Sequence, residues 1–213
     1  MAVLGPVEER QTMIDAAVLP LVKRAIDRPA RMLVAYGFRA DQITLVGFFI
    51  GFLGVLALWL GLFGTALFCL ALNRLADGLD GAVARLTQPT DRGAFLDIAL
   101  DFMFYGLFPL GFAFHDPAVN ALPAAVLICS FIGTGSSFLA FSIIAEKRGV
   151  SSDQYPTKGI YYLGGLTEGT ETIALFVAMC LFPSAFQWLA YAFAALCAIT
   201  TVTRWLAGWQ MFD

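Results

Sequence analysis

Four aspartates lie inside long apolar stretches of the sequence, where charged side chains are rare. They form two pairs, Asp77 with Asp80 and Asp97 with Asp101, spaced three and four residues apart. On helices this spacing places each pair along one face. Counted inward from the polar turn near 87–91, Asp80 and Asp97 lie about six residues deep, and Asp77 and Asp101 about ten. Two antiparallel helices would therefore bring the four carboxylates together.

Carboxylates that converge within lipid need a compensating positive charge. A single charged residue at the bilayer centre costs at least about 2.5 kcal/mol, and like charges in a low dielectric repel one another as well. Carboxylate oxygens are hard ligands, which suit Mg²⁺ or Mn²⁺ better than zinc. The spacing thus predicts a divalent-metal site. The alternative is a set of solvated or proton-relaying carboxylates.

The composition indicates that these aspartates belong to a membrane protein. Of the 213 residues, 59% are hydrophobic, and the mean hydropathy is +0.77. Apolar runs near the ~20 residues needed to cross a bilayer predict an all-α integral membrane fold with six transmembrane helices. The predicted spans are 42–62, 65–86, 93–114, 120–145, 159–182 and 186–207. The pattern carries no sign of a nucleic-acid partner.

The basic residues predict the orientation of these spans. Of the thirteen Lys and Arg residues, only Arg74 lies well inside a span, and the others flank the ends expected on one side. These are Arg10, Lys23, Arg24, Arg28, Arg31, Arg39, Arg85, Arg92, Lys147, Arg148, Lys158 and Arg204. Short cytoplasmic loops retain positive charge. We therefore expect both termini and the aspartates to face the cytoplasm, in an inner (cytoplasmic) membrane.

The residues ahead of the first span predict a helix that lies on the membrane surface. Residues 12–36 mix apolar side chains with Lys23, Arg24, Arg28 and Arg31, which is typical of an interfacial amphipathic helix on an anionic leaflet. Pro20 and Pro29 would kink it or divide it into pieces. We expect a single domain over 1–213, with a cytoplasmic leader at 1–40 and the bundle at 41–213. The alternative for the leader is a solvated segment.

The stretch from Asp77 to Asp101 also carries a longer pattern. It reads DGLDGAVARLTQPTDRGAFLDIALD and follows DxxDGxxAR, seven residues, then GxxxDxxxD. All eight positions match, namely Asp77, Asp80, Gly81, Ala84, Arg85, Gly93, Asp97 and Asp101. Here the chain resembles the CDP-alcohol phosphotransferase (CDP-alcohol phosphatidyltransferase) family, and the six-span layout extends the resemblance over most of the chain.

The resemblance implies transfer of a phospho-linked group from a CDP-alcohol to a second alcohol, with release of CMP. It implies two Mg²⁺ or Mn²⁺ ions held by the four aspartates, with Asp101 as the base for the acceptor hydroxyl. The residues implied in CDP binding are Thr44, Asp77, Gly81, Ala84, Arg85 and Gly93. Homodimerisation is implied by the family as well, and Gly47 and Gly51 have the GxxxG spacing found at some helix interfaces.

Some of these residues also have purely structural interpretations. The small residues of the motif could serve close helix packing, and Arg85 could be a plain positive-inside anchor. Thr44 belongs to DQIT at 41–44, where Ala40 and Asp41 stand in place of the family's more common Pro and Asn. Asp41 and Thr44 could instead begin the first helix.

The acceptor must be inferred from the fourth and fifth spans. Relatives that use phosphorylated acceptors tend to carry basic residues before an Ala-Glu pair, whereas here Lys147 and Arg148 follow Ala145 and Glu146. This departure disfavours a phosphorylated acceptor.

The fifth span offers further candidates, since Glu168, Lys158 and Tyr161 could line an acceptor pocket. For Glu171 we favour an intramembrane ion pair with Arg74, with acceptor binding as the alternative.

The sequence as a whole predicts phosphatidyl transfer from CDP-diacylglycerol to a small polar alcohol in phospholipid biosynthesis. Within the same chemistry, a soluble CDP-alcohol of the CDP-choline or CDP-ethanolamine type could instead donate its head group to a lipid hydroxyl. A cation transporter that uses the intramembrane acids is the alternative from another class.

Overall fold

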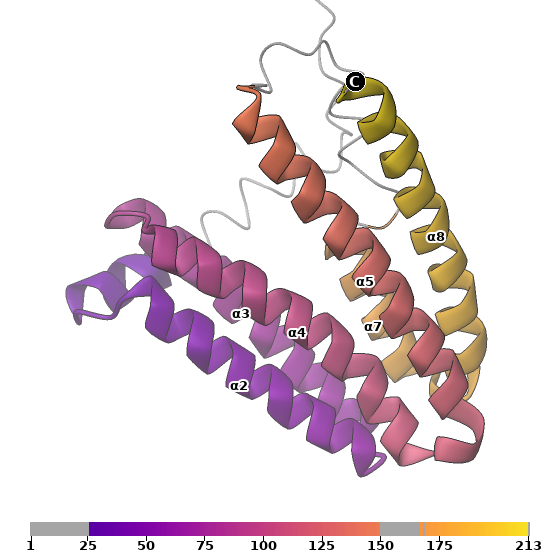
Figure 1. The fold of residues 1–213 in the computed structure, drawn as a ribbon. Coiled ribbons are helices and arrows are strands. Elements are labelled where there is room, and N and C mark those ends of the chain that lie inside the picture. Colours follow the sequence, from indigo (N-terminus) through magenta and orange to yellow (C-terminus); the bar gives the residue numbers. More distant parts are fainter. Residues whose placement is uncertain (1–25, 150–166, 168, 213) are drawn as a thin grey trace, which may run out of the picture.

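The described part of the chain is built from helices. The computed structural model describes residues 26–149, 167 and 169–212. The elements are α2 (Ala40–Trp59), α3 (Phe63–Leu86), α4 (Asp91–His115), α5 (Pro117–Lys147), α7 (Gly169–Leu181), the short 3₁₀ turn η2 (Pro183–Ala185) and α8 (Phe186–Met211) (Figure 1). No strand occurs among the described residues, so the predicted all-α class is confirmed there.

Four segments of the described chain are long and apolar enough to cross a membrane. They are α2, α4, α5 and the run of η2 and α8 over Pro183–Met211. Helix α3 has 24 residues but carries Arg74, Asp77, Asp80 and Arg85, and α7 has 13 described residues. The chain is thus an integral membrane protein, while the count of six crossings stays a prediction.

The outer surface of the bundle is apolar, as expected for contact with lipid. Large side chains such as Trp209, Phe95 and Ile132 are 78%, 69% and 65% exposed. A water-soluble monomer rarely exposes so much contiguous apolar surface. The lipid bilayer therefore takes the place that water has around a soluble protein.

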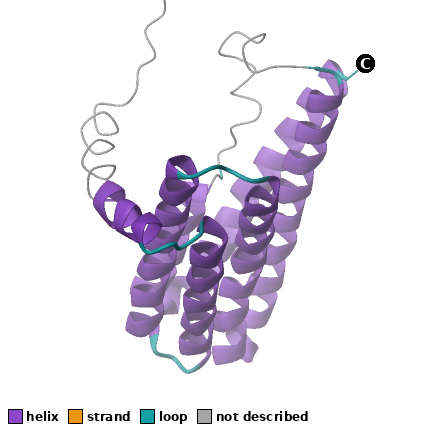
Figure 2. Ribbon diagram, turned by 90° about the vertical axis from the view of Figure 1, so that its left-hand side faces the viewer, coloured by secondary structure: helices purple, strands orange, loops and turns teal. Residues whose placement is uncertain are grey.

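The helices form two groups that diverge from each other (Figure 1). Helix α2 packs against α3 and α4, and α5 packs against α8, while α4 contacts α5 and α3 contacts α7. Short connections join α2 to α3, α3 to α4, α4 to α5 and α7 to α8, and the helices of each pair therefore run antiparallel (Figure 2). The C-terminal end of α3 and the N-terminal end of α4 thus lie at the same end of the bundle.

Phenylalanines fill the contact between the two groups. Phe108 and Phe112 of α4 are fully buried. Phe108 stacks on Phe176 of α7 with ring centroids 4.2 Å apart, and Phe112 stacks on Phe186 of α8 at 4.5 Å. Offset stacking of this kind adds about 0.5–1.5 kcal/mol per pair beyond burial. These ring contacts join α4 to α7 and to the start of α8.

Glycines on α2 allow its backbone to approach its neighbours closely. A Cβ at Gly47 would lie 2.7 Å from Ala76 Cβ of α3, and one at Gly51 would lie 2.8 Å from Phe104 Cε2 of α4. The GxxxG spacing is therefore used within one chain. It offers no support for a dimer interface on this face of α2.

The last part of the leader is helical and packs on the bundle. Residues 26–35 form a helix, seen in indigo at the left of Figure 1. Ala30 is fully buried in a small cluster with Ile43 of α2 and Val83 of α3, while Arg28 and Arg31 are exposed. The helix runs through Pro29 without a break, so Pro29 does not divide it, and it buries one face against the bundle. An interfacial amphipathic helix over 12–36 stays a prediction, and residues 12–25 lie outside the described residues.

Candidate metal and nucleotide site

Helices α3 and α4 bring the predicted aspartates to one end of the bundle. The connection between them is short, and Thr90 starts α4 by accepting a hydrogen bond from the backbone N–H of Gly93 at 3.1 Å. Asp77, Asp97 and Asp101 each place one carboxylate oxygen within 4.8 Å of the others. The antiparallel arrangement inferred from the spacing is therefore present, and three of the four carboxylates converge.

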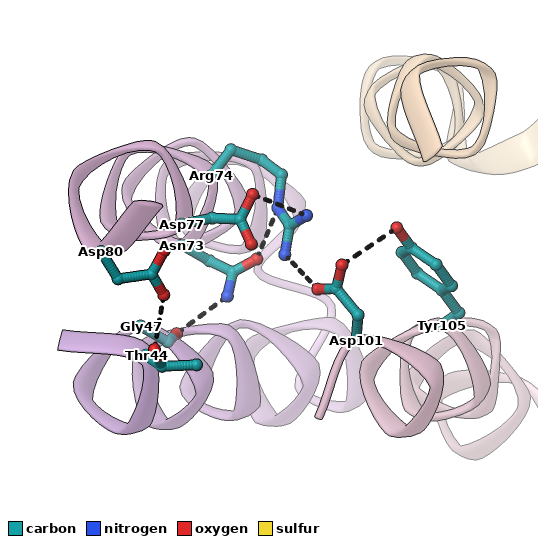
Figure 3. Close-up of polar contacts among 8 residues, drawn as sticks. All are labelled: Thr44, Gly47, Asn73, Arg74, Asp77, Asp80, Asp101 and Tyr105. Atoms are coloured by element: carbon teal, nitrogen blue, oxygen red, sulfur yellow. Dashed lines mark hydrogen bonds and ion pairs between the residues drawn. The ribbon is translucent and has the colours of Figure 1, made fainter. Parts of the chain in front are cut away.

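Asp80 lies beside this group but is held separately. It is buried, with 7% of its surface exposed, and the hydroxyl of Thr44 donates to its Oδ2 at 2.6 Å (Figure 3). All four aspartates line one small cavity with Thr44. Thr44 of α2 is thereby placed against the motif.

The set of donors fits a divalent cation. Carboxylate oxygens are the ligands that Mg²⁺ and Mn²⁺ prefer, and several negative charges at these distances repel unless a cation lies among them. Neither a thiol nor an imidazole belongs to the described group of potential ligands. The residues present therefore suit hard ions held by Asp77, Asp97 and Asp101, with Asp80 adjacent.

Arg74 contacts the aspartate cluster, a contact that we did not predict from the sequence. Its Nη2 lies 3.0 Å from Asp101 Oδ1 and its Nη1 lies 3.7 Å from Asp77 Oδ2 (Figure 3). The spacing held a signal for this, since Arg74 precedes Asp77 by three residues and shares its helix face. The predicted ion pair of Arg74 with Glu171 is wrong, because both carboxylates paired with Arg74 belong to the motif.

A larger pocket of ≈310 Å³ opens next to the aspartates. It is lined from α2, from the 87–90 connection and from the facing ends of α3 and α4. The predicted CDP-binding residues Thr44, Gly81, Ala84 and Gly93 line it, together with Asp80 and Asp97. Asp77 lines the adjoining small cavity instead. A pocket with small residues on its walls and acids at its edge suits a nucleotide that carries phosphates.

Two further charged residues at the mouth of this pocket were missed from the sequence. Asp41 in the first turn of α2 accepts hydrogen bonds from Nε and Nη2 of Arg92 in the first turn of α4, with the Nε distance at 2.8 Å. A Cβ at position 93 would lie 3.1 Å from Asp41 Oδ1, so the pair also explains the need for Gly93. Asp41 was assigned only a possible helix-starting role.

Arg85 lies on the exposed surface at this end of α3. Its guanidinium folds back over Gly81, where a Cβ would lie 3.3 Å from Arg85 Nη1. The side chain thus lies next to the pocket without being among its lining residues. A phosphate at Gly81 would be within reach of its planar donor fork.

The predicted acceptor residues Glu168, Lys158 and Tyr161 lie outside the described residues. The start of α7, however, lies near the aspartates, because a Cβ at Gly169 would be 3.3 Å from the hydroxyl of Tyr105. That hydroxyl is 3.5 Å from Asp101 Oδ2. Helix α7 therefore begins on the side of the site where Asp101 lies.

Comparison with known proteins agrees with this geometry. A membrane-embedded helical bundle with a carboxylate cluster beside a nucleotide-sized pocket defines a class of phosphotransfer enzymes that work at the membrane surface. The family model described as CDP-alcohol phosphatidyltransferase matches residues 38–206. The chain belongs to the CDP-alcohol phosphatidyltransferase family, which confirms the resemblance. The protein is therefore a transferase of phospholipid synthesis.

Individual relatives show how far the similarity extends. The chain is 51% identical over 197 residues to "Inner membrane protein YnjF" of Escherichia coli, covering 92% of this chain and 96% of that protein. It is 31% identical over 123 residues to a phosphatidylcholine synthase of Rhizobium meliloti, covering 55% and 48% of the two chains.

A solved structure shares the fold. It is the phosphatidylinositol phosphate synthase PgsA1 of Mycobacterium tuberculosis with CDP-DAG bound, with a TM-score of 0.66 and 24% identity, covering 87% of this chain and 94% of that one.

Proposed function

We propose that this protein transfers a phosphatidyl group from CDP-diacylglycerol to a small polar alcohol and releases CMP. The observation that carries the proposal is the convergence of Asp77, Asp97 and Asp101 within 4.8 Å beside the ≈310 Å³ pocket lined by Gly81, Ala84 and Gly93. We further propose that the protein works as a single domain in an inner membrane, as a homodimer, with the site and both termini on the cytoplasmic side.

Each residue of the site has a distinct role in the proposed reaction. Thr44, Gly81, Ala84 and Gly93 shape the nucleotide pocket, and Arg85 binds a phosphate. Asp77, Asp80, Asp97 and Asp101 hold two Mg²⁺ or Mn²⁺ ions, which when bound screen the diphosphate and stabilise the CMP leaving group. The acceptor oxygen forms a bond to the phosphorus that carries the lipid, the bond from that phosphorus to CMP breaks, and Asp101 accepts the hydroxyl proton.

The choice of donor rests on the membrane setting and on the relatives. The aspartates lie in helices that are otherwise apolar, where a lipid donor can enter from the bilayer with its tails still in lipid. The M. tuberculosis structure holds CDP-DAG in this fold, which supports a donor with acyl chains.

The choice of acceptor rests on charge. Lys147 ends α5, after the Ala145–Glu146 pair rather than before it. Arg148 donates to the backbone carbonyls of Met211 and Phe212 at the end of α8, and this contact disfavours it as a phosphate ligand. We therefore propose an alcohol without a phosphate, bound by Glu168 with Lys158 and Tyr161. An amino alcohol would pair with the carboxylate of Glu168.

The test is CMP release by purified protein with Mg²⁺. CDP-diacylglycerol should be offered with choline, ethanolamine, serine, glycerol, glycerol 3-phosphate and inositol 1-phosphate in turn, and CDP-choline with diacylglycerol in parallel. We expect CMP release from CDP-diacylglycerol with one unphosphorylated acceptor. CMP release from CDP-choline with none from CDP-diacylglycerol would overturn the donor, and activity with only the phosphorylated acceptors would overturn the acceptor class.

Glu168→Gln tests the acceptor pocket within the same assay. The acceptor KM should rise while the KM for CDP-diacylglycerol stays the same, because the carboxylate is proposed to contact the acceptor alone. An unchanged acceptor KM would remove Glu168 from the pocket.

A further inference from the structure

We infer that Arg74 is a positioning residue that supplies a built-in positive charge to the metal site. It holds the carboxylates together before any ion binds and fixes one oxygen of Asp101. The inference rests on the proposed function only in taking the aspartates as metal ligands. Nothing in the family pattern DxxDGxxAR includes this arginine, which lies three residues ahead of it.

The guanidinium is held in place on several sides. Its Nε donates to Asn73 Oδ1 at 2.9 Å, and Asn73 in turn donates from Nδ2 to the carbonyl of Gly47 at 2.9 Å. Its Cζ lies 5.6 Å from the centre of the Phe104 ring. The side chain is 21% exposed. Its position is therefore set by α2, α3 and α4 together, which is unlike a mobile surface arginine.

The charges around it explain why the site benefits from such a cation. Asp77, Asp97 and Asp101 lie within 4.8 Å of one another, and three like charges this close repel one another even though their side chains are partly open to solvent. Arg74 forms ion pairs with two of the three, Asp101 at 3.0 Å and Asp77 at 3.7 Å. The cluster can therefore assemble during folding in the absence of metal.

Contact with Asp101 also gives Arg74 a part in orienting the proposed base. Arg74 engages Oδ1 of Asp101, while Oδ2 faces the Tyr105 hydroxyl at 3.5 Å. With one oxygen fixed by a charged hydrogen bond, the other is directed toward the side of the site where α7 begins. An arginine suits this task better than a lysine, because its donor fork is planar and rigid.

The same contacts make Arg74 a competitor for incoming ions. A bound Mn²⁺ would be coordinated by the same carboxylate oxygens that Arg74 contacts, and the positive charge of Arg74 would repel it. Removal of Arg74 should therefore lower the thermal stability of the metal-free protein and raise its affinity for the metal ion. A merely structural ion pair would not produce these two opposite effects.

The experiment compares wild type, Arg74→Met and Arg74→Lys in detergent. Thermal unfolding with and without Mn²⁺ and Mn²⁺ binding are measured without substrate, and kcat is measured separately as CMP release from CDP-diacylglycerol with the acceptor found above. Without metal, Arg74→Met should lower the Tm by roughly 5 °C, and saturating Mn²⁺ should close at least half of that gap. Mn²⁺ should bind Arg74→Met roughly tenfold more tightly than wild type. Arg74→Lys should recover most of the metal-free Tm but not kcat.

Arg204→Met is the matched control. Arg204 is a buried arginine of α8, and its Nη1 donates to two groups on α5, the backbone carbonyl of Thr134 at 2.8 Å and the hydroxyl of Ser137 at 3.1 Å. It should lower the Tm equally with and without Mn²⁺ and leave Mn²⁺ affinity unchanged. The same metal-independent behaviour in Arg74→Met would overturn the inference and leave the proposed function standing. A wild type that binds no Mn²⁺ would overturn both. If Arg74→Met does not fold, Arg74→Lys with a wild-type kcat would overturn the orienting role.

Discussion

At the scale of single residues, the four aspartates of the motif are not equivalent. Asp80 is the buried member, hydrogen-bonded to Thr44 on another helix. Asp77, Asp97 and Asp101 form the close group, and Asp101 alone contacts both Arg74 and Tyr105. Different surroundings for chemically identical side chains predict different consequences when each is neutralised.

Asp101→Asn should preserve nucleotide binding better than turnover. Loss of a general base typically lowers kcat by roughly 10²–10⁴-fold, whereas nucleotide affinity measured by titration should fall much less, because three of the four proposed metal ligands remain and Asp101 performs its proposed proton transfer only during the reaction. Asp77→Asn and Asp80→Asn should instead weaken Mg²⁺-dependent nucleotide binding itself. Equal losses of binding and turnover in all three variants would contradict this division of roles.

The matched control for these substitutions is Asp116→Asn. Asp116 caps α5 by accepting a hydrogen bond from the Val119 N–H at 3.3 Å, at the end of α4 away from the aspartates, and asparagine caps helices equally well. Its kcat and nucleotide affinity should match the wild type.

At the scale of helices, glycines on α2 decide how closely α3 and α4 can pack. The nearest neighbours of Gly47 are Ala76 Cβ and the backbone carbonyl of Asn73. Neither can move without shifting α3. Asn73 also accepts a hydrogen bond from Arg74, so a displacement of Asn73 would displace Arg74 beside the aspartates as well.

Gly47→Ala should destabilise the protein by about 1–3 kcal/mol, as expected for overpacking at a rigid contact. Thermal unfolding in detergent measures this. Gly106→Ala on α4 is the control, because nothing lies within 4 Å of a Cβ there; it should be neutral or stabilising by about 0.5–1 kcal/mol. Gly47→Ala should not change the oligomeric state, since Gly47 faces its own chain. Dissociation of a dimer by Gly47→Ala would contradict that.

At the scale of the whole molecule, the basic residues and the site lie at the same end of the bundle. Arg39 precedes α2, Arg85 lies in the last turn of α3, Arg92 lies in the first turn of α4 and Lys147 ends α5. The described connections at the opposite end, 60–62, 116 and 182–185, contain neither lysine nor arginine. This one-sided distribution supports the proposed orientation.

Cysteine labelling tests that orientation. In intact cells, a membrane-impermeant maleimide should label Ser184→Cys in η2 but not Gln88→Cys in the connection between α3 and α4, which should react only after lysis. Both positions are exposed. Wild type controls for the native cysteines at 69, 129, 180 and 197. The reverse pattern of labelling would invert the topology.

Much of the site could be predicted from the sequence because it depends on local spacing. Helical periodicity placed Asp77 with Asp80 and Asp97 with Asp101, and the short turn between their helices required an antiparallel pair. The partner of Arg74 could not be assigned in the same way. Glu171 on α7 and Asp101 on α4 are both acids on helices near α3, which carries Arg74. Only the packing of the helices places Asp101 Oδ1 at 3.0 Å from Arg74 Nη2.

The sequence by itself determined the helices, the membrane environment, the family and the identity of the motif residues, since hydropathy and periodicity act over one or two turns of a chain. The tertiary structure alone decided which faces meet. In the folded chain Gly47 and Gly51 face α3 and α4 rather than a second copy. Asp41 pairs with Arg92 at the mouth of the pocket, and Arg74 lies beside Asp77 and Asp101. Each of these contacts joins residues from different helices, and their distances follow from side-chain packing that no local pattern encodes.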